Sequence, residues 1–182
     1  MVYVAWLRGI NVGGKGMISM AALKKMFERL GFGDVRTYIN SGNVIFTTRA
    51  VSPAPLAKRI EDGIGEDFGF PVKVVLRTRD DMVALLKALP KTWQHDQRAQ
   101  CNVMFLSREI DAPSILSALP SNPSVETVRY TPGAVLWRID RSQVTRSRMT
   151  RIVGTAIYKN MTIRNANTVR RVHALMDDVK GA

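Results

Sequence analysis

Residues 2–19 read VYVAWLRGINVGGKGMIS and join a short apolar run to a glycine-rich loop. The apolar run at residues 2–7 predicts a buried strand. The loop that follows carries four glycines together with Arg8 and Lys15. Glycine allows backbone with positive φ, and successive N–H groups in such loops form concave anion sites. Ser19 then offers a side-chain cap for the start of a helix.

Part of this loop fits the P-loop pattern G-x4-G-K-[ST] through Gly9, Gly14 and Lys15. The next position is Gly16, so the hydroxyl that binds Mg²⁺ in a P-loop is missing. In a P-loop the helix N-terminus also meets the phosphate directly, whereas here the predicted helix begins only after Ser19. The pattern therefore disfavours a P-loop. It leaves two interpretations, a connection that needs positive φ or a different kind of anion site.

The composition is strongly basic, with 27 Lys and Arg against 15 Asp and Glu and a net charge of +12. Such a field attracts polyanions, nucleic acid above all; the alternative is a basic surface that contacts only solvent. The single cysteine, Cys101, permits no intramolecular disulfide, which fits a reducing compartment. We predict that it is a small buried core residue. The N-terminal apolar run is too short for a signal peptide, and no run reaches membrane-spanning length. We therefore expect a soluble, cytoplasmic protein.

The apolar spacing predicts the same order of elements twice. In the first half we expect strands at residues 2–7, 35–39, 44–47 and 72–77, with helices at 19–31 and 52–68 and a trailing helix at 80–89. In the second half we expect strands at residues 101–106, 125–130, 134–139 and 161–164, with helices at 111–119 and 148–158 and a closing helix at 165–179. Strand, helix, strand, strand, helix, strand is the ferredoxin-like order. We predict an α+β fold with two tandem ferredoxin-like units plus a C-terminal helix, in domains at residues 1–90 and 101–182.

The C-terminal part of the chain concentrates cations, with ten Lys or Arg and one acid, Asp140, between Arg129 and Arg171. Ser, Thr and Asn residues are interleaved with them, and guanidinium, hydroxyl and amide groups together make most protein contacts to phosphate. Asn165 is a predicted helix N-cap, which would place Arg164 beside a helix N-terminus. The alternative is an ordinary capped helix with a solvated arginine.

No catalytic constellation stands out in the sequence. His95, His173 and Cys101 do not have the spacing of metal ligands, and the chain contains no G-x-S-x-G elbow. The adjacent acid pairs fall in or beside predicted helices and indicate solvated faces. We therefore assign no catalytic residue, metal ligand or cofactor, and whether the chain is an enzyme stays open.

Three motifs, RGINVGGK at residues 8–15, TYINSGNV at 37–44 and TIRNANTV at 162–169, resemble the bacterial family called domain of unknown function 1697. The resemblance covers essentially the whole chain. Asn40 stands where the family usually has Gln, and Ala166 stands where an aromatic residue is common, which argues against base stacking there. The resemblance implies a two-lobed α+β fold of ferredoxin-like units and implies no substrate, cofactor or catalytic residue.

We expect a binding protein for an anionic, phosphate-bearing ligand, a nucleotide or nucleic acid, with no membrane partner. The alternatives are a small enzyme acting on a phosphorylated or carboxylate metabolite, and a structural or protein-interaction module; the oligomeric state is left open. The glycine-rich loop and the basic segment would form two walls, if the two halves fold face to face. The predicted ligand-binding residues are Arg8, Asn11, Gly13, Gly14, Lys15, Asn43, Arg164, Asn165, Asn167 and Thr168.

Overall fold

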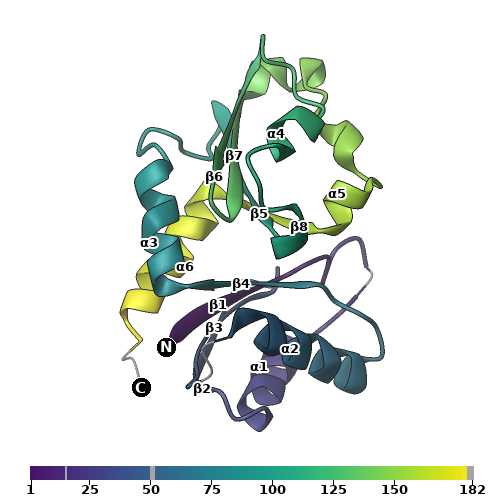
Figure 1. Ribbon diagram of the computed structural model, residues 1–182, viewed down its shortest axis with the longest axis vertical. Coiled ribbons are helices and arrows are strands. Elements are labelled where there is room, and N and C mark those ends of the chain that lie inside the picture. Colours follow the sequence, from purple (N-terminus) through teal and green to yellow (C-terminus); the bar gives the residue numbers. More distant parts are fainter. Residues whose placement is uncertain (15, 50–51, 180–182) are drawn as a thin grey trace. The chain divides into compact units, whose positions relative to one another are not determined.

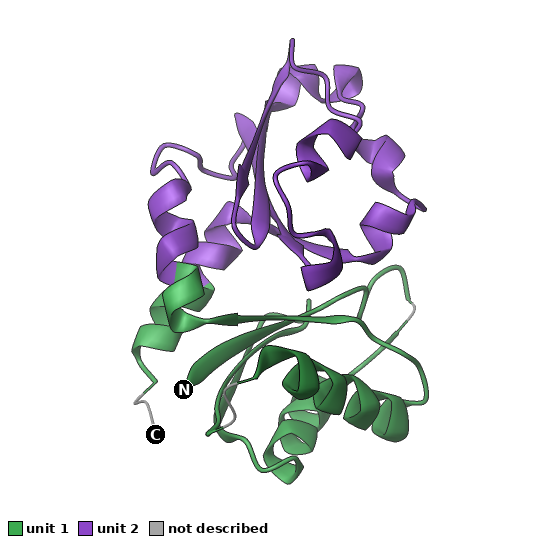
Figure 2. Ribbon diagram, in the orientation of Figure 1, with its two compact units in different colours: residues 1–82, 172–182 green, residues 83–171 purple. Residues whose placement is uncertain are grey.

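The computed structural model describes residues 1–14, 16–49 and 52–179, which belong to two compact units (Figures 1 and 2). Unit 1 combines residues 1–82 with the residues from 172 onwards, and unit 2 is residues 83–171. Helices α3 (Arg79–Ala88) and α6 (Ala166–Asp177) each contribute residues to both units. The domains expected at residues 1–90 and 101–182 stay a prediction.

Unit 1 contains one four-stranded sheet in which every neighbouring pair is antiparallel, in the order β2-β3-β1-β4. Its elements are β1 (Val2–Leu7), α1 (Met20–Arg29), β2 (Gly33–Tyr38), β3 (Asn43–Thr47), α2 (Pro53–Phe68) and β4 (Val74–Thr78). Helices α1 and α2 lie against one face of the sheet (Figure 1). Tyr3, Ala5 and Leu7 alternate along β1 and pack into the same core as Phe27 and Phe46.

The ends of the unit 1 helices follow the signals in the sequence. Ser19 caps α1, since its side chain accepts a hydrogen bond from the backbone N–H of Ala22 at 3.2 Å. Pro53 occupies the first turn of α2. Gly69 ends α2 in the left-handed conformation, with φ of 77°. The chain leaves α2 through Phe70 and Pro71 and enters β4, so the end of α2 borders the sheet.

Unit 2 contains a second four-stranded antiparallel sheet, in the order β6-β7-β5-β8. Its elements are β5 (Ala99–Leu106), η1 (Arg108–Ile110), α4 (Ile115–Ala118), β6 (Glu126–Thr131), β7 (Ala134–Asp140), η2 (Arg141–Arg146), η3 (Met149–Ile152), α5 (Ala156–Lys159) and β8 (Met161–Asn165). The core joins Met104 and Trp137 on the sheet with Ile115 of α4 and Ile152 of η3. The mixed α+β class, with two four-stranded antiparallel sheets and several helices, is therefore confirmed.

The single helix predicted at residues 148–158 is wrong. The chain instead forms the 3-10 turn η3 and then the short helix α5. Gly154 between them has φ of 87°, which a continuous helix excludes. Thr155 restarts the helix: its hydroxyl donates to the carbonyl of Ile152 at 2.7 Å and accepts from the N–H of Tyr158 at 3.2 Å. The basic residues of this region consequently lie on irregular backbone.

Among the described residues, no helix has the length and apolar character that a membrane span requires. The longest helix, α2, has 16 residues.

Two glycines on α2 have different surroundings and give a matched prediction. A Cβ at Gly63 would lie 3.2 Å from Leu30 Cδ1 and 3.2 Å from Met26 Sδ, whereas a Cβ at Gly65 would meet no atom within 4 Å. We expect Gly65→Ala to raise the free energy of unfolding by about 0.5–1 kcal/mol, because alanine is the better helix former. We expect Gly63→Leu to lower it by about 1–3 kcal/mol through overpacking and Gly65→Leu to be tolerated. Urea unfolding measures all three variants, and equal effects of the two leucines would contradict the packing described here.

Candidate functional site

Within unit 1, the glycine-rich loop is tied to the turn between β2 and β3 by Asn11. Its Nδ2 donates to the carbonyls of Ile18 at 2.9 Å and Asn40 at 2.8 Å, and its Oδ1 accepts from the N–H of Ile18 at 2.7 Å. Asn11 itself has φ of 54°, a conformation that asparagine tolerates better than most residues. Both amide hydrogens of Asn11 are therefore committed to holding the loop in shape.

The turn at residues 39–42 packs closely against the start of the same loop. A Cβ at Gly42 would lie 2.8 Å from both Ile10 Cδ1 and Leu7 Cβ, so only glycine fits there. The N–H of Leu7 donates to the carbonyl of Gly42 at 2.9 Å. Asn43 is fully buried, and its Nδ2 donates to the carbonyl of Tyr38 at 2.9 Å and to Ser41 Oγ at 3.2 Å. Asn11 and Asn43, two predicted site residues, thus position one loop and one turn.

The predicted site residues at the tip of the loop are exposed. Gly13 and Gly14 have φ of 58° and 75°, and a Cβ on either would meet no atom within 4 Å. Their glycine character is therefore set by backbone conformation, since no neighbour crowds them. Lys15, the cation predicted at this tip, lies outside the described residues.

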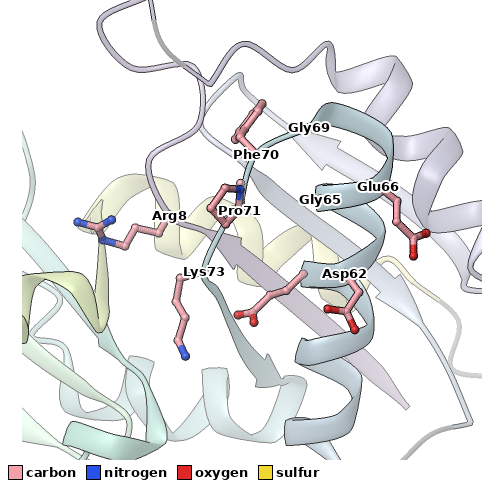
Figure 3. A pocket seen from close by; sticks show the side chains of 10 residues that line it. Arg8, Asp62, Gly65, Glu66, Gly69, Phe70, Pro71 and Lys73 are labelled. Carbon is pink, nitrogen blue, oxygen red and sulfur yellow. The ribbon is translucent and has the colours of Figure 1, made fainter.

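Arg8, at the other end of the loop, lines a cleft of about 850 Å³ within unit 1 (Figure 3). Its lining includes three acids of α2, Glu61, Asp62 and Glu66, and the cations Arg8 and Lys73. Phe70 and Pro71, on the connection from α2 to β4, also line the cleft. We call this space the α2 cleft. Arg8 could be predicted from the sequence, but the three acids were missed, because they have the pattern of an ordinary solvated helix face.

The predicted residues of unit 2 lie at the junction of β8 with α6. Arg164 has 8% exposure, and its Nη1 donates to Thr162 Oγ1 at 2.7 Å and to the carbonyl of Ile163 at 2.8 Å. Burial lowers the pKa of this guanidinium to about 10. Asn165 caps α6, since its Oδ1 accepts from the N–H of Thr168 at 2.7 Å. The predicted N-cap is confirmed, and Arg164 stands directly before it.

Asn167 and Arg170, on the first turns of α6, hold the loop at residues 90–98. Asn167 donates through Nδ2 to the carbonyl of His95 at 2.8 Å and accepts from its N–H at 3.2 Å through Oδ1. Arg170 donates to the carbonyls of Trp93 and Pro90, both at 2.9 Å. Burial lowers the pKa of Arg170. The described contacts of the Asn167 amide therefore order this loop.

The charge of the chain is concentrated in unit 2. Residues 83–171 contain fourteen Lys and Arg against five Asp and Glu, a net charge of +9 out of the +12 of the whole chain. We call residues 141–159 the basic segment; it comprises η2, η3 and α5. Its cations are all exposed: Arg141, Arg146, Arg148, Arg151 and Lys159. The side chains of Arg148 and Arg151 make no hydrogen bond or ion pair with any described residue.

A buried carboxylate fixes the basic segment to the sheet. Glu126, on β6, has 6% exposure and accepts hydrogen bonds from the N–H of Asn122 at 2.5 Å, Trp137 Nε1 at 2.8 Å and Ser147 Oγ at 2.7 Å. Asn122 adds a bond from its Nδ2 to the carbonyl of Arg146 at 3.0 Å. The backbone at the C-terminal end of η2 is thereby held in place. Sequence reasoning missed Glu126, since a lone acid on a strand resembles a solvent-facing residue.

Cys101 is confirmed as a buried core residue, with no exposed surface. Burial raises the pKa of its thiol, an effect that Arg138 partly opposes. His95 contacts the backbone of Cys101, with Nδ1 3.1 Å from the carbonyl oxygen. Among the described residues there is also no group of three or more His, Cys, Asp or Glu that would hold a metal ion.

The burial of Cys101 makes a prediction about its reactivity. We expect the native protein at pH 8 to react with dithionitrobenzoate only as fast as the fold opens, because the thiolate is disfavoured and shielded. The same chain in concentrated guanidinium chloride should react at the rate of a free thiol. Absorbance of the released thionitrobenzoate follows both reactions. Rapid labelling of the folded chain would contradict the burial.

Comparison with known proteins identifies a matching family model and a similar solved structure. The sequence model of a family described as "Protein of unknown function (DUF1697)" matches residues 1–137. The structure of conserved bacterial protein SP0830 from Streptococcus pneumoniae is similar, with a TM-score of 0.82 and 27% sequence identity. The likeness covers 96% of this chain and 98% of that one. Among curated proteins, no sequence matches this chain.

Proposed function

As the chain belongs to the DUF1697 family of proteins of unknown function, we propose a function from its own residues: it binds nucleic acid in the cytoplasm through the phosphate backbone. The observation that carries this proposal is the concentration of charge in unit 2, with exposed arginines along the basic segment. Arginine donates to phosphate bidentately, and each neutralised phosphate releases counterions. Because the fold already anchors this segment, little conformational entropy is lost when it binds a polyanion.

Hydroxyl groups beside the arginines support contact with phosphate. Ser142, Thr145 and Thr150 are exposed and alternate with the arginines along the basic segment. Serine and threonine hydroxyls, with arginine, supply many of the bonds that proteins make to phosphate oxygens. The segment therefore offers charge and neutral donors along the same stretch of chain.

The aromatic side chains of unit 2 favour backbone contact over base stacking. Residues 83–171 are all described, and none of their aromatic side chains is exposed: Trp93, Phe105 and Trp137 are buried, and Tyr130 and Tyr158 are half-buried. Proteins that bind single strands use exposed aromatic side chains on which bases stack. We therefore propose that the protein binds duplexes through their phosphates, with little dependence on sequence.

The ligand-binding residues predicted from the sequence have separate roles in this proposal. Arg8, Gly13, Gly14 and Lys15 would supply a second, smaller phosphate contact at the glycine-rich loop, where Asn11 and Asn43 hold the backbone. Arg164, Asn165, Asn167 and Thr168 would support anion binding around the start of α6. We also propose that each unit is ferredoxin-like, because both sheets have the strand order and antiparallel pairing expected of that fold.

Fluorescence anisotropy across a salt titration tests the proposal, with labelled duplex DNA and single-stranded RNA as the two probes. We expect duplex binding that persists at physiological salt. In a plot of log affinity against log salt concentration, the magnitude of the slope should be about 0.9 for each of several contacted phosphates. Single-stranded RNA should bind more weakly. Binding that appears only at low salt would refute the proposal, because it would show that the charge is generic.

A further inference from the structure

The glycine-rich loop and the turn at residues 39–42 carry a group of exposed apolar side chains. Among the described residues, five large apolar side chains are exposed, and three of these lie on the loop and the turn and are called the apolar rim: Val12 (64% exposed), Met17 (68%) and Ile39 (50%). Each is the chain neighbour of a residue in the hydrogen-bonded group Asn11, Ile18 and Asn40. Exposed apolar side chains that gather on one surface mark interaction sites, whereas single ones need no explanation.

Ile39 holds its position at a cost to the backbone. Its φ is 48°, in the left-handed region where a β-branched residue is a rare outlier. Because the residue is half exposed, packing offsets little of this cost. The two other described non-glycine residues with positive φ are Asn11 and Asp34, whose side chains tolerate that region better. Strained residues cluster at binding and catalytic sites, which indicates that Ile39 serves a purpose other than folding.

The backbone beside the apolar rim suits a phosphate group. Gly13 and Gly14 lie between Val12 and Met17 in the chain, and both are exposed with positive φ. Glycine lets a ligand approach the backbone closely, and N–H groups in such loops bind anions. Proteins that bind the minor groove of DNA insert aliphatic side chains, isoleucine and methionine among them, between base steps. The loop and the turn therefore offer both contacts that a deformed duplex requires.

We propose that the apolar rim inserts between base pairs of duplex DNA at points of weak stacking, such as a mismatch. This inference rests on the proposed binding of duplexes and adds a preference for deformed sites. Inserting a side chain unstacks one base step, which costs least where a mismatch has already disturbed the stacking. A mismatch leaves the number of phosphates unchanged. The gain in affinity should therefore be the same at every salt concentration.

Fluorescence anisotropy with the full chain tests this preference. The probes are two labelled duplexes of equal length that differ in one central pair, T·A or mismatched T·T. We expect the mismatched duplex to bind at least about fivefold more tightly, with the same salt slope. A 2-aminopurine beside the mismatch should brighten on binding, because unstacking relieves its quenching. Equal affinities would overturn the inference and leave the proposed nucleic-acid binding intact, whereas failure to bind either duplex would overturn both.

Ile39→Asn separates binding from folding. Asparagine tolerates positive φ, so we expect the melting temperature to rise by about 2–4 °C. The same substitution should reduce the preference for the mismatched duplex to less than about twofold, because it removes the inserted side chain. A misfolded protein would not show this combination. Val12→Ser together with Met17→Ser should reduce the preference likewise. A preference that survives both changes would overturn the inference.

Two control variants assign the preference to the apolar rim. Asp34 is exposed on β2 and has φ of 45°, so Asp34→Gly relieves a positive φ without removing apolar surface. The ratio of the two affinities should stay unchanged in this variant. Arg148→Gln should weaken binding to both duplexes by the same factor, because it removes only a phosphate contact. Loss of the preference in either control would show that it does not come from the apolar rim.

Discussion

Replacing Arg146, Arg148 and Arg151 together by Gln is expected to weaken binding to duplex DNA by about a hundredfold at physiological salt, with the salt slope reduced by about 0.9 for each lost phosphate contact. All three side chains are exposed: Arg146 on η2, Arg151 on η3 and Arg148 between them. Glu126 and Asn122 hold the backbone at Arg146 and Ser147. Glutamine keeps length and polarity but removes the charge. Anisotropy with the same duplex at several salt concentrations gives both quantities.

A matched control removes the same charge from unit 1. Lys24, Lys25 and Arg29 are exposed on α1, and their replacement by Gln leaves the net charge of the chain equal to that of the first variant. We expect less than about a threefold loss of affinity from this control, because these exposed charges lie outside the basic segment and are screened by salt. Similar losses in both triple variants would show that net charge, and not the basic segment, governs binding.

Glu126→Ala is expected to lower the free energy of unfolding by about 3–5 kcal/mol, and the melting temperature by roughly 10 °C for a chain of this size. The substitution leaves the N–H of Asn122, the indole of Trp137 and the hydroxyl of Ser147 without their acceptor. Buried donors that lose a partner cost their full desolvation energy. Urea unfolding monitored by tryptophan fluorescence measures the change.

Two milder substitutions separate the contributions to this loss of stability. Ser147→Ala keeps the carboxylate and removes one of its donors, so we expect a cost of about 1 kcal/mol. Glu126→Gln keeps the volume of the side chain but replaces one acceptor oxygen by a donor. Its loss of unfolding free energy should therefore lie between those of Ser147→Ala and Glu126→Ala. A Glu126→Ala protein as stable as the parent would show that the three hydrogen bonds add nothing to the fold.

Glu126 also couples the stability of unit 2 to the proposed function. Its bond to Ser147 fixes the backbone that carries Arg146 and Arg148. We therefore expect Glu126→Gln to weaken duplex binding without removing any positive charge from the surface.

The order of elements could be predicted from the sequence because it depends on local signals. A continuous apolar run marks β1, Ser19 marks the start of α1, and Gly69 marks the end of α2. These signals act over a few residues and need no knowledge of tertiary contacts. The helix predicted at residues 148–158 is wrong because that prediction also used only local signals. Its composition suits a helix, but the conformation of Gly154 and the packing of Met149 and Ile152 into the core decide otherwise.

The candidate sites could be predicted only in part, because their contacts join residues far apart in the chain. Asn11 was predicted to bind the ligand, whereas its described side-chain bonds go to Ile18 and Asn40, and the bond to Asn40 depends on how two loops meet. Asn167 was expected at a ligand, whereas its described bonds go to the backbone of His95. The α2 cleft brings Arg8 together with residues of α2 that are more than 50 positions away in the sequence, which local signals do not reveal.

The division of α6 between the two units has a consequence for the order in which the protein matures on the ribosome. The sheet of unit 1 is complete once β4 has been synthesised, but Arg79 of the same unit donates to the carbonyls of Met176 and Val179, which follow the whole of unit 2 in the chain. A nascent chain that has just produced β4 therefore holds an arginine without these acceptors until residues 83–171 have emerged. Unit 1 is thus the first to begin folding and the last to finish, and unit 2 must form in the interval.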